Sequence, residues 1–205
     1  MSQVIKFDVW TWKDIMRVCG NAISDDDARE MLHYIRIRCE NNRFTAVGAN
    51  AYQASTIDGD CDMKEQWPSV EILIRPQKTP PKTKMVELTP FTNAPGEDGV
   101  KVHMLYFYDK DMNVTGSWDE PIIEGKYINI DAVMKAAQHN IDQCNHGEGA
   151  YMIAVNPQYL MGALEGMKDC EAVIMNFGSN VQPFIIRPFK GEQNRTALVF
   201  PVRIL

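Results

Sequence analysis

The sequence lacks the patterns that mark membrane, secreted and disulfide-rich proteins. No apolar run in its 205 residues approaches the length of a membrane-spanning helix, and the N-terminus does not have the basic, apolar and small-residue order of a signal peptide. The cysteines are odd in number and never form a C-x-x-C pair, which argues against a disulfide framework. We therefore expect a cytoplasmic protein, with no membrane association, whose thiols are reduced at Cys19, Cys39, Cys61, Cys144 and Cys170.

Catalytic and cofactor signatures are missing as well. The chain has no G-x-S-x-G, Walker loop, H-E-x-x-H or dinucleotide fingerprint. The run 58–62 resembles the start of a calcium loop, but Met63 stands where such a loop needs glycine, which favours a polar turn. Cys144 and His146 have no second ligand pair nearby. The sequence therefore predicts no enzyme, no cofactor and no metal site.

The net charge excludes fewer functions than the missing motifs do. The formal charge is −6, and the fractions of hydrophobic (45%) and charged (23%) residues are ordinary for a soluble globular protein. An acidic balance argues against indiscriminate coating of nucleic acid. It leaves duplex DNA open as a partner, because a protein of acidic net charge can still carry basic side chains on one of its surfaces.

The N-terminal part shows a recognisable order of elements. A strand, a helix capped by Thr11, a hairpin of two strands and a third strand are expected at 4–9, 11–20, 32–39, 43–47 and 50–57. Trp12, Ile15, Met16 and Cys19 form the apolar face of this helix.

The C-terminal part repeats this order. A strand from about 151 leads to Asn156, a good N-cap, and to Pro157, whose missing N–H costs nothing at a helix start. The helix expected at 157–168 has its apolar residues at helical spacing, and short strands follow. These apolar residues are Tyr159, Leu160, Ala163, Leu164 and Met167.

The C-terminal order, with its final Phe200-Pro-Val-Arg-Ile-Leu205, resembles the C-terminal half-domain of bacterial DNA polymerase sliding clamps, the polymerase III beta subunit family. The segment Glu124-Gly-Lys-Tyr127 is similar to a connector of that family, with Ile128 in place of its usual proline. At 49–53 only Tyr52 matches the family signature. The resemblance implies an α+β, DNA-clamp-like fold, in which two pseudo-symmetric strand-helix-meander halves pack their helices on one side of antiparallel sheets.

The two halves are expected to form one domain. We assign 1–66 and 149–205 to a single clamp-like domain, with 67–148 as an inserted strand-rich and helical segment. Within the insert, Ile130, Val133, Met134, Ala137 and Ile141 recur at helical spacing. A degenerate second domain is the alternative, and the insertion is favoured because the middle shows no second complete strand-helix-meander unit.

Basic residues on the expected helices are candidates to face DNA phosphates, through contacts that do not depend on base sequence. The alternative for each is an ordinary solvated surface, and the C-terminal helix is poor in basic residues on its outward side. The candidates are Lys13, Arg17, Lys135, His139 and Lys168.

The chain end supplies a candidate docking groove. In the family, the segment that corresponds to Phe200, Pro201, Val202 and Arg203 forms one wall of a groove that captures short apolar peptides. Apolar walls anchor such a peptide, and nearby polar groups fix its direction. The alternative is an edge strand that closes a sheet.

Two functional hypotheses follow from the resemblance. The first is a sliding-clamp-like replication processivity factor, a homo-oligomer that encircles or contacts duplex DNA non-specifically and docks peptides of a DNA polymerase or clamp loader. The second is a clamp-fold protein-interaction module that no longer encircles DNA. Both hypotheses require no catalytic residues.

Overall fold

The computed structural model describes most of the chain. The described residues are 4–63, 69–93, 101–123, 125–143, 153–190 and 194–202. The helical segments are α1 (Val9–Gly20), the 3-10 segment η1 (Asp27–His33), α2 (Ile130–Gln143) and α3 (Pro157–Glu165). The strands are β1 (Ile5–Asp8), β2 (Ile35–Glu40), β3 (Arg43–Ala49), β4 (Gln53–Asp60), β5 (Asp62–Met63), β6 (Val70–Ile74), β7 (Met85–Asn93), β8 (Lys101–Tyr108), β9 (Val114–Pro121), β10 (Val173–Asn176), β11 (Phe184–Pro188) and β12 (Arg195–Val199).

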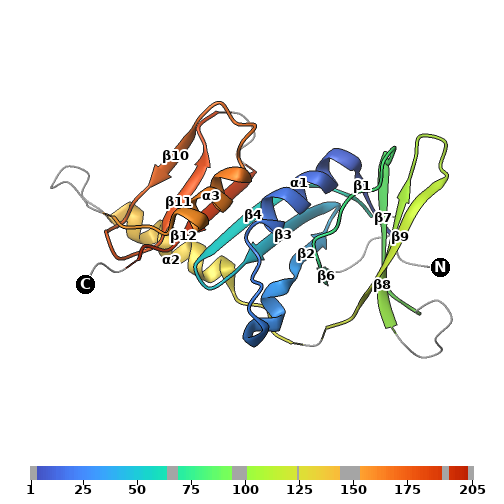
Figure 1. Ribbon diagram of the computed structural model, residues 1–205, viewed down its shortest axis with the longest axis horizontal. Helices are drawn as coiled ribbons and strands as arrows, with labels where there is room; N and C mark the ends of the chain where they lie inside the picture. The colour runs from blue at the N-terminus through green and yellow to red at the C-terminus, as the bar shows by residue number, and fades with distance from the viewer. Residues whose placement is uncertain are drawn as a thin grey trace.

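The described strands form two antiparallel sheets (Figure 1). A five-stranded sheet has the order β5-β1-β7-β8-β9, and a seven-stranded sheet has the order β10-β11-β12-β4-β3-β2-β6. In the larger sheet β12 pairs with β4, so that Arg195 lies opposite Ile57 and Val199 opposite Gln53. The strands from both ends of the chain thus form one continuous sheet.

The main core lies between the two sheets and under α1. Ile5, Phe7 and Leu105 of the smaller sheet join Ile37 of the larger sheet and Trp12 of α1 in one buried cluster. The rings of Phe7 and Trp12 are 5.6 Å apart. Alternation along the strands produces this arrangement, because every second side chain of a strand points to the same face.

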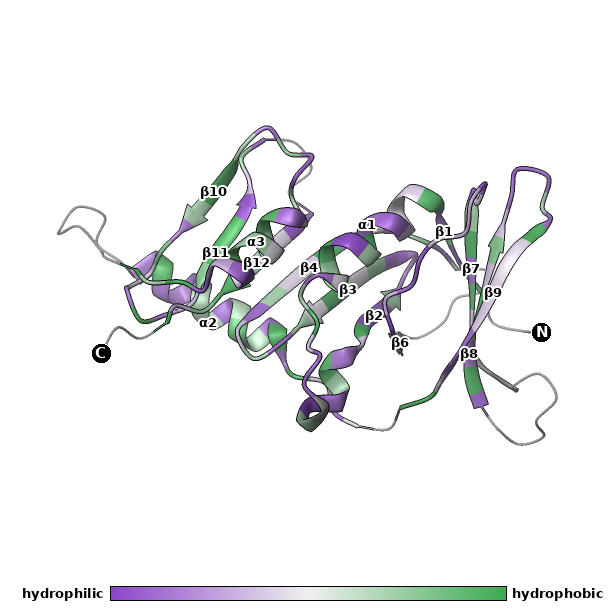
Figure 2. Cartoon of the chain, viewed as in Figure 1, coloured by the Kyte–Doolittle hydropathy of each residue, from purple (hydrophilic) through white to green (hydrophobic). Residues whose placement is uncertain are grey.

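Helices cover both faces of the seven-stranded sheet. Phe184 and Ile186 of β11 cluster with Ala163 of α3, whereas Ile185 between them clusters with Ala137 of α2. Figure 2 shows β11 as hydrophobic along most of its length, as expected of a strand that is covered on both faces. The helices α1 and α3 therefore share one face of the sheet, as the sequence predicted, and α2 lies on the opposite face.

Helix α1 begins two residues earlier than predicted. The carboxylate of Asp8 accepts hydrogen bonds from the backbone N–H groups of Trp10 and Thr11, at 2.8 and 3.0 Å. The hydroxyl of Thr11 also donates to Asp8. The prediction of Thr11 as the cap was wrong, because the carboxylate three residues before it satisfies the free N–H groups of the first turn.

Helix α3 begins where the sequence predicted and ends earlier. Asn156 accepts a hydrogen bond from the N–H of Gln158 at 2.9 Å, and Pro157 occupies the first turn. The helix ends at Glu165, and Gly166 follows as its C-cap. The residues up to 170 form a turn that leads to β10, so the predicted end at 168 was three residues too late.

The described cysteines Cys19, Cys39, Cys61 and Cys170 are free thiols, and Cys144 lies outside the described residues. Among the described helices, none is both long and apolar enough to cross a membrane. The assignment of 1–66 and 149–205 to one domain stays a prediction.

Candidate functional site

A turn between β3 and β4 builds one side of the candidate site. The side-chain oxygen of Asn50 accepts hydrogen bonds from the backbone N–H groups of Tyr52 and Gln53, at 2.8 and 2.9 Å. This turn leaves the Tyr52 side chain 50% exposed. Its ring stacks on Tyr159 of α3, with 4.9 Å between the ring centroids and 9° between the ring planes. We call Tyr52 and Tyr159 the tyrosine pair.

The chain end runs directly beside this turn. The N–H of Phe200 donates to the carbonyl of Tyr52 at 2.9 Å, and the N–H of Val202 donates to the carbonyl of Ala154 at 2.7 Å. Phe200 and Pro201 are half-buried and Val202 is exposed. Three of the four predicted groove residues therefore lie together near the tyrosine pair, and Arg203 lies outside the described residues.

An apolar groove of about 520 Å³ opens beside Phe200. One wall is η1, the floor is the turn before β4 with the start of that strand, and the second wall is the start of α2. The lining residues are Ala28, Arg29, Glu30, Met31, Leu32, Asn50, Ala51, Gln53, Ala54, Ile128, Ile130, Val133 and Phe200. We call this set the apolar groove.

Tyr127 fixes the α2 wall of the groove. Its hydroxyl donates to the backbone carbonyls of Tyr34 and Val47, at 3.1 and 3.4 Å. Burial raises the pKa of the Tyr127 phenol above its usual range, so the group stays a protonated donor. Because Ile128 follows directly in the chain, these bonds hold the groove wall against the sheet.

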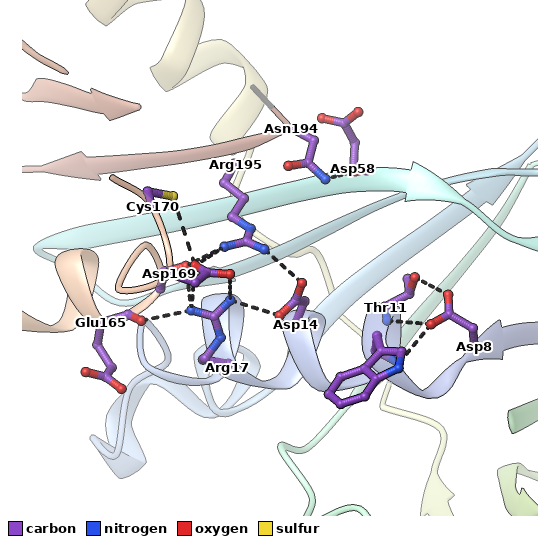
Figure 3. Close-up of polar contacts among 12 residues, drawn as sticks. Asp8, Thr11, Asp14, Arg17, Asp58, Glu165, Asp169, Cys170, Asn194 and Arg195 are labelled. Carbon is purple, nitrogen blue, oxygen red and sulfur yellow. Dashed lines mark hydrogen bonds and ion pairs between the residues drawn. The ribbon is translucent and has the colours of Figure 1, made fainter. Parts of the chain in front are cut away.

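Arg17, one of the residues predicted to face DNA, lies in a cluster of charges that joins α1 to the segment after α3 (Figure 3). Its guanidinium contacts the carboxylates of Asp14 at 2.8 Å and Asp169 at 3.2 Å. Arg195 of β12 contacts the same two carboxylates, at 2.8 and 2.6 Å. We call Asp14, Arg17, Asp169 and Arg195 the charge cluster.

The electrostatics of the cluster follow from these contacts. Partial burial raises the pKa of Asp169, but the hydrogen bond from Arg195 and the charges of both arginines outweigh it. The pKa of Asp169 therefore lies below its usual value, and the carboxylate is ionised at neutral pH. Each charge in the cluster has partners of opposite sign, so the cluster presents no excess of positive charge to a phosphate.

The other four DNA candidates do not share one surface. Lys13 is exposed on α1, with its ammonium 5.1 Å from the ring centroid of Trp10. Lys168 forms an ion pair with Glu165 at the end of α3. Lys135 and His139 are exposed on α2, which lies on the opposite face of the sheet.

Sequence reasoning did not find either wall of the apolar groove. The sequence predicts that Leu32 of η1 starts a strand and predicts no element at Met31, and no local pattern shows that they meet the start of α2. The spacing of Ile130 and Val133 predicted the helix correctly but not what it packs against. Among the described residues, no three His, Cys, Asp or Glu side chains are grouped as a metal site would require.

Comparison with solved structures identifies the fold. The DNA polymerase III beta chain of Streptococcus pneumoniae superposes with a TM-score of 0.73 at 15% identity over 100% of this chain and 66% of that one. A putative DNA polymerase III beta subunit of Eubacterium rectale gives 0.72 at 15% identity, over 98% and 66% of the two chains. The sliding clamp of Bacillus subtilis gives 0.66 at 15% identity, over 98% and 64%.

The chain thus has the fold of the sliding clamps, and it spans 64–66% of the length of these three proteins. The α+β, clamp-like fold implied by the sequence is confirmed. No protein-family model matches the chain, and no curated protein matches its sequence. At these identities the likeness concerns the fold, and what the chain binds is a separate question.

Proposed function

We propose that this chain is a sliding-clamp-like protein whose main activity is to dock a short apolar peptide of a replication partner, such as a DNA polymerase or a clamp loader. The observation that carries this proposal is the apolar groove of about 520 Å³, with Phe200 in its lining and the tyrosine pair beside it. Its walls come from η1 and the start of α2, and its floor from the turn before β4 and the start of that strand. A preformed apolar groove with few polar groups suits an apolar anchor residue of a linear peptide.

The groove also offers direction to such a peptide. Arg29 and Glu30 lie in the η1 wall and are charged residues of its lining. Buried apolar anchors dominate the affinity of an interface, and polar groups at its rim select the orientation. Of the predicted groove residues, Phe200 lines the groove, and we propose that Pro201, Val202 and Arg203 extend its surface.

A binding measurement with a matched pair of variants tests the docking proposal. The probe is a fluorescein-labelled hexapeptide that carries leucine and phenylalanine, and the readout is fluorescence anisotropy. Ile128→Asp introduces a carboxylate at a groove residue that is 37% exposed. We expect the dissociation constant to rise about tenfold or more, because the carboxylate must be desolvated against an apolar ligand.

Val114→Asp is the control, because Val114 is also exposed, at 56%, and lies on β9 of the other sheet. It should leave binding unchanged. Equal effects of the two substitutions, or no binding of the probe by the parent protein, would refute docking in this groove.

Contact with duplex DNA is a second candidate function, and the exposed Lys13 on α1 favours it. Helix α1, helix α3 and the turn 166–170 together carry three basic residues (Lys13, Arg17, Lys168) and three acidic ones (Asp14, Glu165, Asp169). This layer is therefore neutral. Because the chain spans about two thirds of a clamp, encirclement of DNA would also require assembly of copies into a homo-oligomer.

The salt dependence of DNA binding tests the second candidate function. If Lys13 alone reaches a phosphate, the slope of log K against log salt is about −1 for each chain that contacts the duplex, and Lys13→Glu abolishes it. Lys135→Glu should change nothing, because α2 lies on the other face of the sheet. A slope near −4, or equal losses in both variants, would favour a broader basic surface that includes Arg17, His139 and Lys168.

A further inference from the structure

The charge cluster lies at one end of α3, and the tyrosine pair lies at the other end. Asp169 follows the C-terminus of the helix, and Tyr159 occupies its first turn. Besides its two carboxylate partners, Arg17 donates to the backbone carbonyls of Glu165 and Gly166, at 3.2 and 3.1 Å. A cation on these carbonyls satisfies acceptors that the helix itself leaves free and interacts favourably with the helix dipole. Arg17 of α1 thus caps α3.

Small residues bring the two helices into close contact. A Cβ on Gly162 would lie 3.2 Å from the carbonyl oxygen of Asn21, just past the end of α1, and one on Gly166 would lie 3.4 Å from the Cα of Val18. As the residue number rises along α3 it falls along α1, so the helices run antiparallel. A helix contact made by such small residues sets the distance between the helices, but it has few interlocking side chains that would keep α3 from shifting along its axis.

The remaining contacts of α3 are apolar. Of its nine residues Ala163 is buried, and Tyr159, Leu160 and Leu164 pack partly buried against the sheet. A helix this short is not stable without such contacts to the rest of the protein. The charge cluster supplies contacts that depend on axial position, because two arginines and two carboxylates from three separate segments must meet.

We propose that the charge cluster is a latch that sets the axial position of α3 and thereby holds Tyr159 against Tyr52, which stands in the chain between the groove residues Ala51 and Gln53. Its role in peptide capture rests on the docking function proposed above, whereas its role in holding the tyrosine pair does not. In this arrangement Arg17 and Asp169 are positioning residues that touch no ligand.

Two readouts test the latch on the full-length chain. The first is hydrogen exchange of the α3 amides, with the amides of β2 and β3 as a measure of global unfolding. The second is the affinity for the fluorescein-labelled hexapeptide. For Arg17→Met we expect α3 exchange to be about tenfold faster and the affinity about fivefold lower, with β2 and β3 unchanged, because the cap and two ion pairs are lost together.

Arg17→Lys keeps the charge, but its single nitrogen cannot bond both carboxylates and both carbonyls, so it should restore part of the loss. Lys13→Met is the matched control, because Lys13 lies on the same helix outside the cluster, and it should leave both readouts unchanged. If Arg17→Met fails to fold, Asp169→Asn tests the same point, since Asp169 is exposed and lies in a turn.

The outcomes separate the latch from the docking function. Unchanged α3 exchange, or faster exchange in β2 and β3 to the same degree, overturns the latch. Faster α3 exchange with unchanged peptide affinity overturns its role in capture. If the parent protein does not bind the hexapeptide, the docking function fails, and the exchange data alone decide whether the cluster holds the tyrosine pair.

Discussion

Helix α1 buries five side chains, whereas helix α3, its counterpart in the C-terminal half, buries Ala163 alone. The five are Val9, Trp12, Ile15, Val18 and Cys19. The first helix is thus held by the main core, and the second by a short apolar contact, a seam of small residues and the charge cluster. Because α3 also carries Tyr159, the less deeply anchored helix is the one that contributes a ring to the tyrosine pair.

The sharpest test of this comparison truncates one apolar side chain of similar size on each helix. Ile15→Ala removes a side chain that is 0% exposed, and it should lower the free energy of unfolding by about 4 kcal/mol. Leu164→Ala removes a half-buried side chain, and the loss should be about 1–2 kcal/mol. Urea denaturation measures both. Equal losses would show that the two helices are anchored alike.

The closeness of helix packing gives the next largest effect. A Cβ on Gly48 of β3 would lie 1.9 Å from the carbonyl oxygen of Cys19, so α1 must move if it is added. Gly48→Ala should therefore cost about 3 kcal/mol of stability. Gly166→Ala, whose nearest contact on α1 is 3.4 Å, should change stability by about 0.5 kcal/mol or less. A tolerated Gly48→Ala would contradict the tight packing of α1, and thermal unfolding is sufficient to see it.

The smallest effects concern two carboxylates whose pKa values shift in opposite directions. Burial raises the pKa of Glu120 in β9, although Trp118, the Arg75 amide and the Arg75 charge lower it. The folded protein then holds this proton more tightly than the unfolded chain. Stability is lost as the pH rises from the unfolded pKa through the folded one. We therefore expect the free energy of unfolding of Glu120→Gln, relative to that of the parent, to be higher at pH 7 than at pH 4.

Asp169 behaves in the opposite way, because its folded pKa is lowered. Its contribution is present above the unfolded pKa and is lost as the pH falls through the folded pKa. Asp169→Asn should be less stable than the parent at pH 7, and the difference should shrink in acid. Unfolding curves of the parent and both variants at about pH 2, 4 and 7 measure the two signs, because the Asp169 contribution is lost below the usual pKa of 3.8. The same sign for both would show that the cluster does not stabilise the Asp169 carboxylate.

Local chemistry explains which elements the sequence predicted well. Asn156 followed by Pro157 fixes the start of α3 by adjacent hydrogen bonds and backbone geometry, so it is readable without the fold. The start of α1 was misread because two capping residues, Asp8 and Thr11, stand close together and the better acceptor prevails. The helical spacing from Ile130 to Ile141 predicted α2 correctly.

Contacts between distant segments explain what the sequence did not predict. Periodicity shows which side of α2 is apolar, but it does not tell which face of the sheet that side covers. Arg17 is a basic residue on a helix, which made it a candidate to face DNA. Its partner Asp169 lies 152 residues away, and no local pattern shows this pairing. The η1 wall of the groove was missed for the same reason. The assignment of Phe200 to a groove wall came from the family resemblance and not from the spacing of residues.

The position of β12 has a consequence for how the protein is made. This strand pairs with β4 although Thr56 and Thr196 are 140 residues apart, and β4 is a central strand of the seven-stranded sheet. At a translation rate of roughly 5–20 residues per second, roughly seven to thirty seconds pass between the synthesis of β4 and that of β12. Throughout that time the nascent chain presents a long unpaired edge to other chains. Synthesis of this protein therefore has a period of exposure that ends only when β12 emerges and closes the sheet.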